Sequence, residues 1–270
     1  MITDSMNLID IFNQILGEQK WISYWINKYL PKVTKLFSKQ FQFPVYHYEK
    51  IKSNKTNNEY WILYTKENRN SEIKYGLYLK HISENYLYIF EYGYTSEINE
   101  EKTKTIAVAG FNVYTGHFLS RYQERFLKKN NLSTEEILGE YKANNPYVVN
   151  LKLSNEILKD YKEKYGNFSR INRIKSGYCF VDSGIQEDDR PIEKYVTNKV
   201  SADIYNTFIT DSMLTKTQLN GLKKAELDYA NDFYNNISEL RELDMYKNNE
   251  DLKRLQMKTA QNIIIQKMIK

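Results

Sequence analysis

The sequence has 270 residues, with 39 Lys and Arg against 34 Asp and Glu, so its formal net charge is +5. A single cysteine excludes a disulfide-rich scaffold and a cysteine-rich zinc module. The mean hydropathy is −0.68, and no apolar run approaches the ~20 residues of a membrane-spanning helix. With 41% hydrophobic residues and only four prolines, the chain is expected to fold as one large or two small soluble domains.

The expected compartment is the cytoplasm, because no basic and apolar leader follows Met1 and Cys179 is the only thiol. Lysine outnumbers arginine 31 to 8, and asparagine, isoleucine and tyrosine are also abundant. This bias is typical of an AT-rich coding sequence, so a lysine says little about function, whereas an arginine or a histidine says more. The net charge permits binding to nucleic acid without requiring it.

A helical region is predicted over residues 6–38. Its apolar residues recur at helical spacing, and Trp21, Trp25 and Tyr29 repeat every four residues. Pro31 can begin a second short helix, since a proline inside a helix kinks it. The aromatic residues are interpreted mainly as core packing, and a base-stacking platform is the alternative.

The next part of the chain predicts an antiparallel meander, because runs rich in tyrosine and β-branched residues alternate with polar turns. The five expected strands span residues 43–48, 60–64, 75–79, 86–90 and 105–111.

Residues 117–164 are predicted to be helical again. Ser133 and Glu136 have the spacing of a capping box, in which each side chain bonds the backbone of the other residue. A short helix over 154–165 is expected to end at Gly166. Two further strands are predicted over 176–181 and 201–209, with an acidic loop between them that lacks the spacing of a calcium loop.

Residues 213–270 predict a pair of helices that cover the domain or bind a partner chain, with a nucleic-acid arm as the alternative. The predicted fold class is therefore α+β: an antiparallel sheet meander with an N-terminal helix, a central helical insertion and a C-terminal helical pair. The expected segments are 1–114, 115–212 and 213–270, which could also form a single domain.

One group of residues could carry chemistry. His117, Arg121, Glu124 and Arg125 follow a predicted strand at spacings that place them on one face of a helix. A neutral imidazole is a competent general base near pH 7, and the nearby arginines favour the neutral form. Two guanidinium groups can hold a phosphate. A base with an arginine clamp is what metal-independent RNA cleavage through the 2′-hydroxyl needs, and Glu124 could orient His117 or an arginine.

The alternative interpretation of this face is an ordinary salt-bridged helix surface. Four secondary candidates could line a path for nucleic acid, although a solvated loop or strand packing would also explain them: Arg170, Arg173, Lys175 and Tyr178. No metal site and no cofactor are expected, because the three histidines are scattered and the phosphate-loop and dinucleotide motifs are absent.

The run H-x3-R-x2-E-R, followed by Leu132-Ser133-Thr134-Glu135-Glu136-Ile137, resembles the helical opening of BrnT-like toxins and the related domain of unknown function 4258. The resemblance covers residues 115–212. It implies a RelE-type ribonuclease fold in which helices precede an antiparallel sheet, and it carries His117, Arg121 and Arg125 over as the matching positions. This chain has about 110 more residues before the motif and about 60 more after it than those toxins would need.

The leading hypothesis is a toxin-like, metal-independent endoribonuclease that acts on RNA. A non-catalytic protein of a phage or mobile element, which binds nucleic acid or a partner protein, is the second hypothesis. An oligomeric assembly protein that uses its helical ends is the third. The sequence does not define the oligomeric state.

Overall fold

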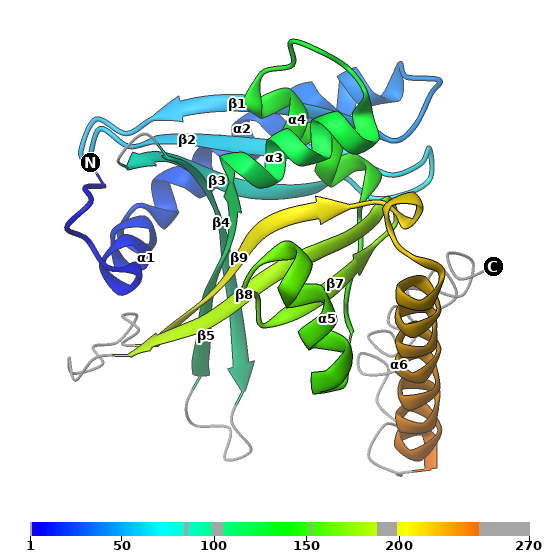
Figure 1. Cartoon of the computed structure of the whole chain (residues 1–270). Helices are drawn as coiled ribbons and strands as arrows, with labels where there is room; N and C mark the ends of the chain where they lie inside the picture. The colour runs from blue at the N-terminus through cyan, green and yellow to red at the C-terminus, as the bar shows by residue number, and fades with distance from the viewer. Residues whose placement is uncertain (1, 84–85, 99–104, 152, 188–198, 243–270) are drawn as a thin grey trace.

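The fold is built on one nine-stranded sheet (Figure 1). The computed structural model describes residues 2–83, 86–98, 105–151, 153–187 and 199–242. Within them the strand order is β1-β2-β3-β4-β5-β9-β8-β7-β6. All neighbouring strands pair antiparallel except β5 and β9, which run parallel. The expected α+β fold is thus confirmed, but the sheet is mixed rather than a simple antiparallel meander.

The strands form two runs that meet at the parallel pair. The first run is a meander of consecutive strands: β1 (Val45–Lys52), β2 (Glu59–Lys66), β3 (Lys74–Ser83), β4 (Tyr86–Ile98) and β5 (Thr105–Thr115). The second run comprises β6 (Val148–Leu151), β7 (Arg170–Ile174), β8 (Gly177–Glu187) and β9 (Lys199–Ile209). β6 and β7 were not among the expected strands. The pairing of β5 with β9 joins strands from the expected segments 1–114 and 115–212 in one sheet. The division of the chain into these segments stays a prediction.

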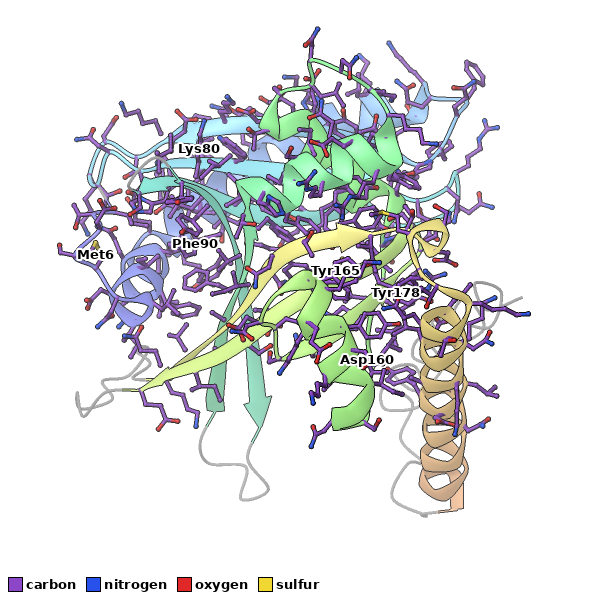
Figure 2. All side chains as sticks on the ribbon, in the orientation of Figure 1. Met6, Lys80, Phe90, Asp160, Tyr165 and Tyr178 are labelled. Carbon is purple, nitrogen blue, oxygen red and sulfur yellow. The ribbon has the colours of Figure 1, made fainter. Side chains whose placement is uncertain are left out.

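The helices cover both faces of the sheet. α1 (Leu8–Gly17) and α2 (Gln19–Ser38) pack on the first run, while α5 (Asn155–Tyr165) and α6 (Lys216–Glu242) pack on the second. The other face carries α3 (Gly116–Tyr122) and α4 (Thr134–Asn144). In Figure 2, Phe90 lies beside α1, whereas Tyr165 and Tyr178 lie beside α5 and α6.

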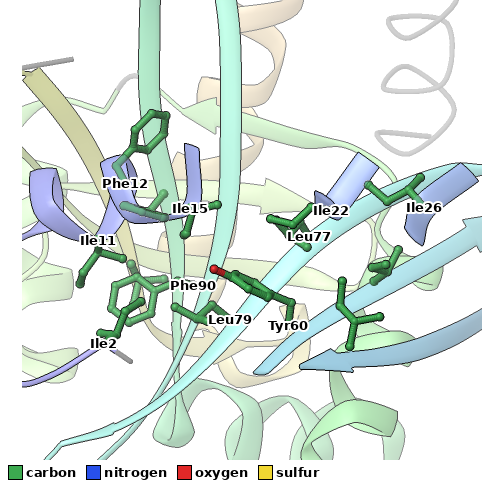
Figure 3. Close-up of a cluster of buried hydrophobic side chains, with 14 of the residues drawn as sticks. Ile2, Ile11, Phe12, Ile15, Ile22, Ile26, Tyr60, Leu77, Leu79 and Phe90 are labelled. Carbon is green, nitrogen blue, oxygen red and sulfur yellow. The ribbon is translucent and has the colours of Figure 1, made fainter. Parts of the chain in front are cut away.

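Strand alternation decides which core each side chain enters. In β2, Tyr60, Ile62 and Tyr64 point to the core under α1 and α2, which Figure 3 shows in part. Trp61 and Leu63 point to the core under α3 and α4. β2 is therefore buried on both faces, as the burial of all five residues shows.

The break between the first two helices falls at Glu18, not at Pro31. The backbone N–H of Glu18 bonds the carbonyl of Ile15 and ends α1, and α2 then runs through Pro31, which lies on its solvent side. The buried Glu18 carboxylate fixes this break, because it accepts hydrogen bonds from the hydroxyls of Ser53, Thr56 and Tyr60. Pro31 therefore lies inside a helix and does not begin one.

Other local signals are confirmed. Ser133 and Glu136 form the reciprocal capping box of α4, and Gly166 ends α5 with φ +86°, a conformation that favours glycine. The second C-terminal helix expected after residue 250 lies outside the described residues. In the parts of the chain that the structure covers, no helix is long and apolar enough to span a membrane.

Candidate functional site

The helix that carries His117 is fixed by its apolar side. Phe118 and Tyr122 are fully buried, and their rings contact Tyr205 and Phe208 of β9 with centroid distances of 5.5 and 5.0 Å. Thr115 caps the helix: its hydroxyl accepts from the N–H of Phe118 and donates to the carbonyl of Tyr205. These contacts hold α3 along the second half of β9, so its polar side faces outward.

His117 is exposed on that outward side. Partial burial lowers the pKa of its imidazole, the charges of Arg121 and Arg125 lower it further, and Glu124 opposes them. The net direction is downward from the ordinary value of 6.5. His117 is therefore mostly neutral at pH 7, the protonation state that a general base requires. The structure brings all four predicted residues of this face close enough to interact electrostatically.

Arg121 and Arg125 have different partners. The Arg121 guanidinium bonds the Glu124 carboxylate at 2.8 Å, and the two side chains are 38% and 54% exposed, respectively. Arg125 lies in the π-helical turn η1 (Gln123–Leu127) that continues α3, and it donates to the carbonyl of Phe208. β5 pairs with β9 only as far as Tyr205, so Phe208 lies beyond the end of that pairing. Arg125 thus satisfies a β9 carbonyl that β5 does not reach.

An open hollow of about 520 Å³ adjoins this face. Lys128 and Asn131, which lie where the chain leaves η1, both have positive φ. The hollow is lined by polar and charged residues, of which Lys129 is paired with Glu140: Ser120, Gln123, Glu124, Lys128, Lys129, Asn130 and Asn131. Glu124 belongs both to the hollow and to the His117 face, so the two form one continuous polar surface. Amides and ammonium groups of this kind suit a sugar–phosphate chain.

The two secondary arginines lie on β7 and point to opposite faces of the sheet. Their spacing of three residues in a strand requires this. Arg170 pairs with Asp203 of β9. Arg173 bonds Asp211 at 3.0 Å and lies 3.4 Å from the buried carboxylate of Glu226. The two side chains therefore do not line one path along the surface.

Tyr178 is fully buried beneath α6. Its hydroxyl donates to Glu226 at 2.6 Å, and the Arg173 guanidinium covers its ring at 4.6 Å. No base can stack on the ring in this arrangement. Lys175, by contrast, is exposed in the turn between β7 and β8.

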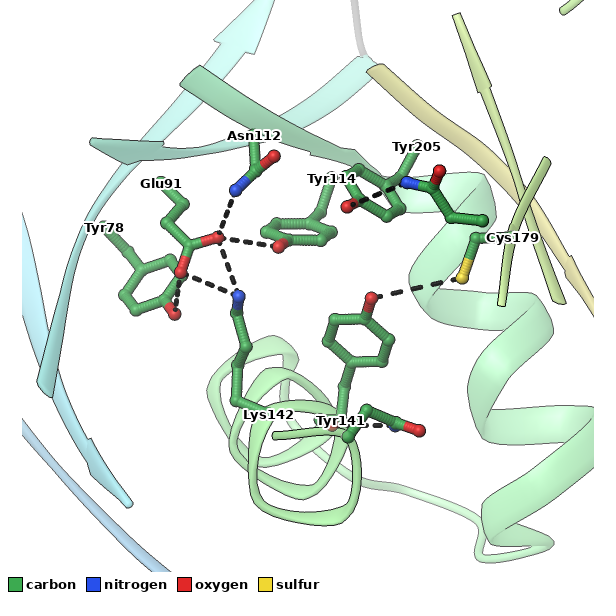
Figure 4. A network of polar contacts seen from close by, with 10 residues as sticks. Tyr78, Glu91, Asn112, Tyr114, Tyr141, Lys142, Cys179 and Tyr205 are labelled. Carbon is green, nitrogen blue, oxygen red and sulfur yellow. Dashed lines mark hydrogen bonds and ion pairs between the residues drawn. The ribbon is translucent and has the colours of Figure 1, made fainter. Parts of the chain in front are cut away.

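A buried polar network joins α4 to the centre of the sheet (Figure 4). The Glu91 carboxylate accepts hydrogen bonds from Tyr78 and Tyr114 at 2.7 Å and from Asn112 at 2.9 Å. It also forms an ion pair with Lys142 of α4 at 2.7 Å, and the two side chains are only 15% and 19% exposed. Burial raises the pKa of Glu91, but Lys142 and the tyrosine hydroxyls lower it by more, so the net direction is downward.

This network was not predicted from the sequence, although one signal was available. Glu91 lies two residues after Ile89 in a strand, and Ile89 is fully buried on the same face. A carboxylate at a core-facing position needs a cationic or hydrogen-bonding partner. All oxygens of Glu91 have partners in the structure, so the network fixes α4 rather than offering a free site.

Cys179 is buried, and burial raises the pKa of its thiol well above the ordinary value, so the thiol is not a nucleophile here. Among the described residues, no three His, Cys, Asp or Glu side chains gather as metal ligands would. His47 and His81 bind Glu49 and Asp4, respectively, away from the His117 face. Comparison with protein families, curated proteins and solved structures finds no match for the chain.

Proposed function

We propose that this chain is an RNA-binding, metal-independent endoribonuclease whose reaction takes place at the His117 face of α3. The observation that carries the proposal is the imidazole on the outward side of α3, whose pKa is lowered by partial burial and by the charges of Arg121 and Arg125. The adjoining polar hollow supports it, because it extends the same surface along a path that a strand of RNA could follow.

In the proposed reaction His117 takes the proton of a ribose 2′-hydroxyl. The 2′-oxygen attacks the adjacent phosphorus, the bond from phosphorus to the 5′-oxygen breaks, and that oxygen takes a proton from water. The products are a 2′,3′-cyclic phosphate and a 5′-hydroxyl end. Arg121 stabilises the negative charge that develops on the phosphoryl oxygens, and Arg125 contributes charge while its guanidinium stays bound to Phe208. Glu124 holds Arg121 until phosphate replaces it.

The test is cleavage of a short RNA in EDTA, compared with the 2′-deoxy strand of the same sequence. His117→Ala should abolish cleavage, and Arg121→Ala should lower it at least about a hundredfold, as expected for loss of a group that stabilises transition-state charge. Arg69→Ala is the matched control, because Arg69 is an exposed arginine in the turn between β2 and β3. Full activity in both site variants would overturn the assignment, as would cleavage of the 2′-deoxy strand.

A non-catalytic role in binding nucleic acid is the second candidate, and one observation favours it. Both guanidinium groups already have partners within the chain, Arg121 with Glu124 and Arg125 with Phe208. RNA binding that weakens steeply with salt but leads to no cleavage would support this alternative.

A further inference from the structure

A second surface of the molecule lies on α2, on the face of the sheet opposite to α3. At 3.6 residues per turn, α2 buries Ile22, Ile26, Val33 and Phe37 on one side. One flank of the remaining surface collects aromatic rings and three of the four lysines of the helix: Trp21, Tyr24, Trp25, Lys28, Lys32 and Lys35. The other flank collects mainly small polar residues, together with the fourth lysine: Lys20, Ser23, Asn27, Thr34 and Ser38. We call the first of these the aromatic–lysine flank.

The rings of this flank contact one another and the neighbouring ring of Tyr29. Trp25 stacks on Tyr29 with a centroid distance of 5.5 Å and meets Tyr24 edge-on at 5.5 Å. The Lys28 ammonium lies over the Trp25 ring at 4.3 Å. Tyr24 is 57% exposed, so one ring of this cluster is accessible to solvent.

The charge of the flank has one sign. α2 contains four lysines and neither aspartate nor glutamate. Glu49 of β1 neutralises Lys32, while Lys28 and Lys35 are exposed. Lysine is common throughout this chain, so the number of lysines is weak evidence. Three of the four, Lys28, Lys32 and Lys35, lie on the flank that also carries the exposed rings, and this grouping complements a ligand with both negative charge and planar rings.

We propose that the aromatic–lysine flank of α2 binds single-stranded nucleic acid. A base stacks on Tyr24, Lys28 leaves the Trp25 ring for a backbone phosphate, and Lys35 contacts a phosphate farther along the helix. Stacking on aromatic side chains combined with a cationic track is the general mode of single-strand binding. A duplex hides the faces of its bases, so it binds only through the lysines. The inference does not rest on His117, since the two surfaces lie on opposite faces of the sheet.

Tryptophan fluorescence reports this surface separately from the His117 face. Two of the three tryptophans, Trp21 and Trp25, belong to the flank, and the third, Trp61, is 1% exposed in the other core. Titration with a 12-nucleotide single strand should quench the fluorescence, and a duplex of the same length should quench it much less. RNA and DNA strands are run in parallel arms to show whether the 2′-hydroxyl contributes, and quenching by either supports the proposal.

The variants use exposed positions so that folding is preserved. Tyr24→Ala should weaken binding about five- to a hundredfold, and Tyr24→Phe should restore it, because stacking needs only the ring. Lys28→Ala should reduce the slope of log affinity against log salt by about 0.7, the amount expected for one lost phosphate contact with a single strand. Asn27→Ala on the other flank and Lys159→Ala, an exposed lysine of α5, are the matched controls.

His117→Ala separates this inference from the proposed function, because it should leave the quenching unchanged even where it abolishes cleavage. Absence of quenching by every single strand would overturn the inference. Equal affinity for strand and duplex would overturn it too, and so would unchanged affinity in Tyr24→Ala and Lys28→Ala.

Discussion

Two pairs of arginines in this molecule have the same charge but different surroundings. On β7, Arg170 pairs with the half-buried Asp203, and Arg173 approaches Glu226, which is 4% exposed. On α3 and η1, Arg121 pairs with an exposed glutamate of its own helix, and Arg125 bonds a backbone carbonyl.

The burial of its partner determines whether an arginine is available to bind a ligand. A buried carboxylate that loses its cation is left with a large desolvation penalty, so Arg173 is committed to the fold. An exposed ion pair contributes only about 0–1 kcal/mol, so a phosphate can displace Glu124 from Arg121 at small cost. The β7 pair is therefore structural, and the α3 pair carries the proposed function.

The largest expected effect on stability comes from removing the buried ion pair of Arg173 on β7. Arg173→Met should lower the free energy of unfolding by about 3–5 kcal/mol, because Glu226 would stay buried without its cation. Urea unfolding measures the loss. Arg69→Met at an exposed turn should change stability by less than about 0.5 kcal/mol, and equal losses in both variants would refute the structural role of Arg173.

Lys142→Met should cost about 3 kcal/mol at pH 7, near the lower end of the range for a broken buried pair, because Glu91 keeps its three other donors. The lowered pKa of Glu91 means that its contribution is present above the unfolded pKa and is lost as pH falls through the folded pKa. The deficit of the variant should therefore shrink between pH 7 and pH 3. A deficit independent of pH would contradict the ion pair.

Ser133→Ala should lower stability by about 1 kcal/mol, since it removes the side chain that caps α4. Ser133→Asp, which can still accept the hydrogen bond, serves as the control and should retain most of the stability. Thermal unfolding of the two variants side by side is sufficient, and an equal loss in both would argue against the cap.

Arg121→Gln should have the smallest effect on stability, within about 1 kcal/mol, because it removes only an exposed ion pair. The difference between the stability losses of Arg121→Gln and Arg173→Met directly compares the two pairs of arginines. A loss of several kcal/mol from Arg121→Gln would show that Arg121 is needed for folding. It would then argue against Arg121 as a group that is free to bind phosphate.

Much of the fold could be predicted from the sequence, because its local signals are strong. The tyrosine-rich strands from residue 43 onward, the capping box at Ser133 and the glycine stop at Gly166 all depend on neighbouring residues. The parallel pairing of β5 with β9 could not be predicted, since residues such as Tyr114 and Tyr205 meet across more than 80 positions of sequence. β6 has only four residues, too few to show a period.

In the candidate site, too, contacts between residues close in sequence could be predicted, and contacts between distant residues could not. His117, Arg121 and Glu124 come together because the continuous helical segment of α3 and η1 carries them, so their spacing was enough. The structural role of Arg173 could not be predicted from the sequence. Its partners Asp211 and Glu226 lie 38 and 53 positions later, and they approach Arg173 only once the sheet and α6 have formed. Tyr178 was open to misinterpretation for the same reason, since a tyrosine in a strand can face a core or the solvent.

The most direct test of the central claim is the pH dependence of RNA cleavage by the unaltered chain and by Arg121→Gln. The lowered pKa of His117 predicts that cleavage by the unaltered chain declines only below pH 6.5, as the imidazole takes up its proton. Removing the Arg121 charge should lower the rate and move this acidic decline to higher pH. Cleavage with no acidic decline, or a decline at the same pH in both proteins, would contradict the account.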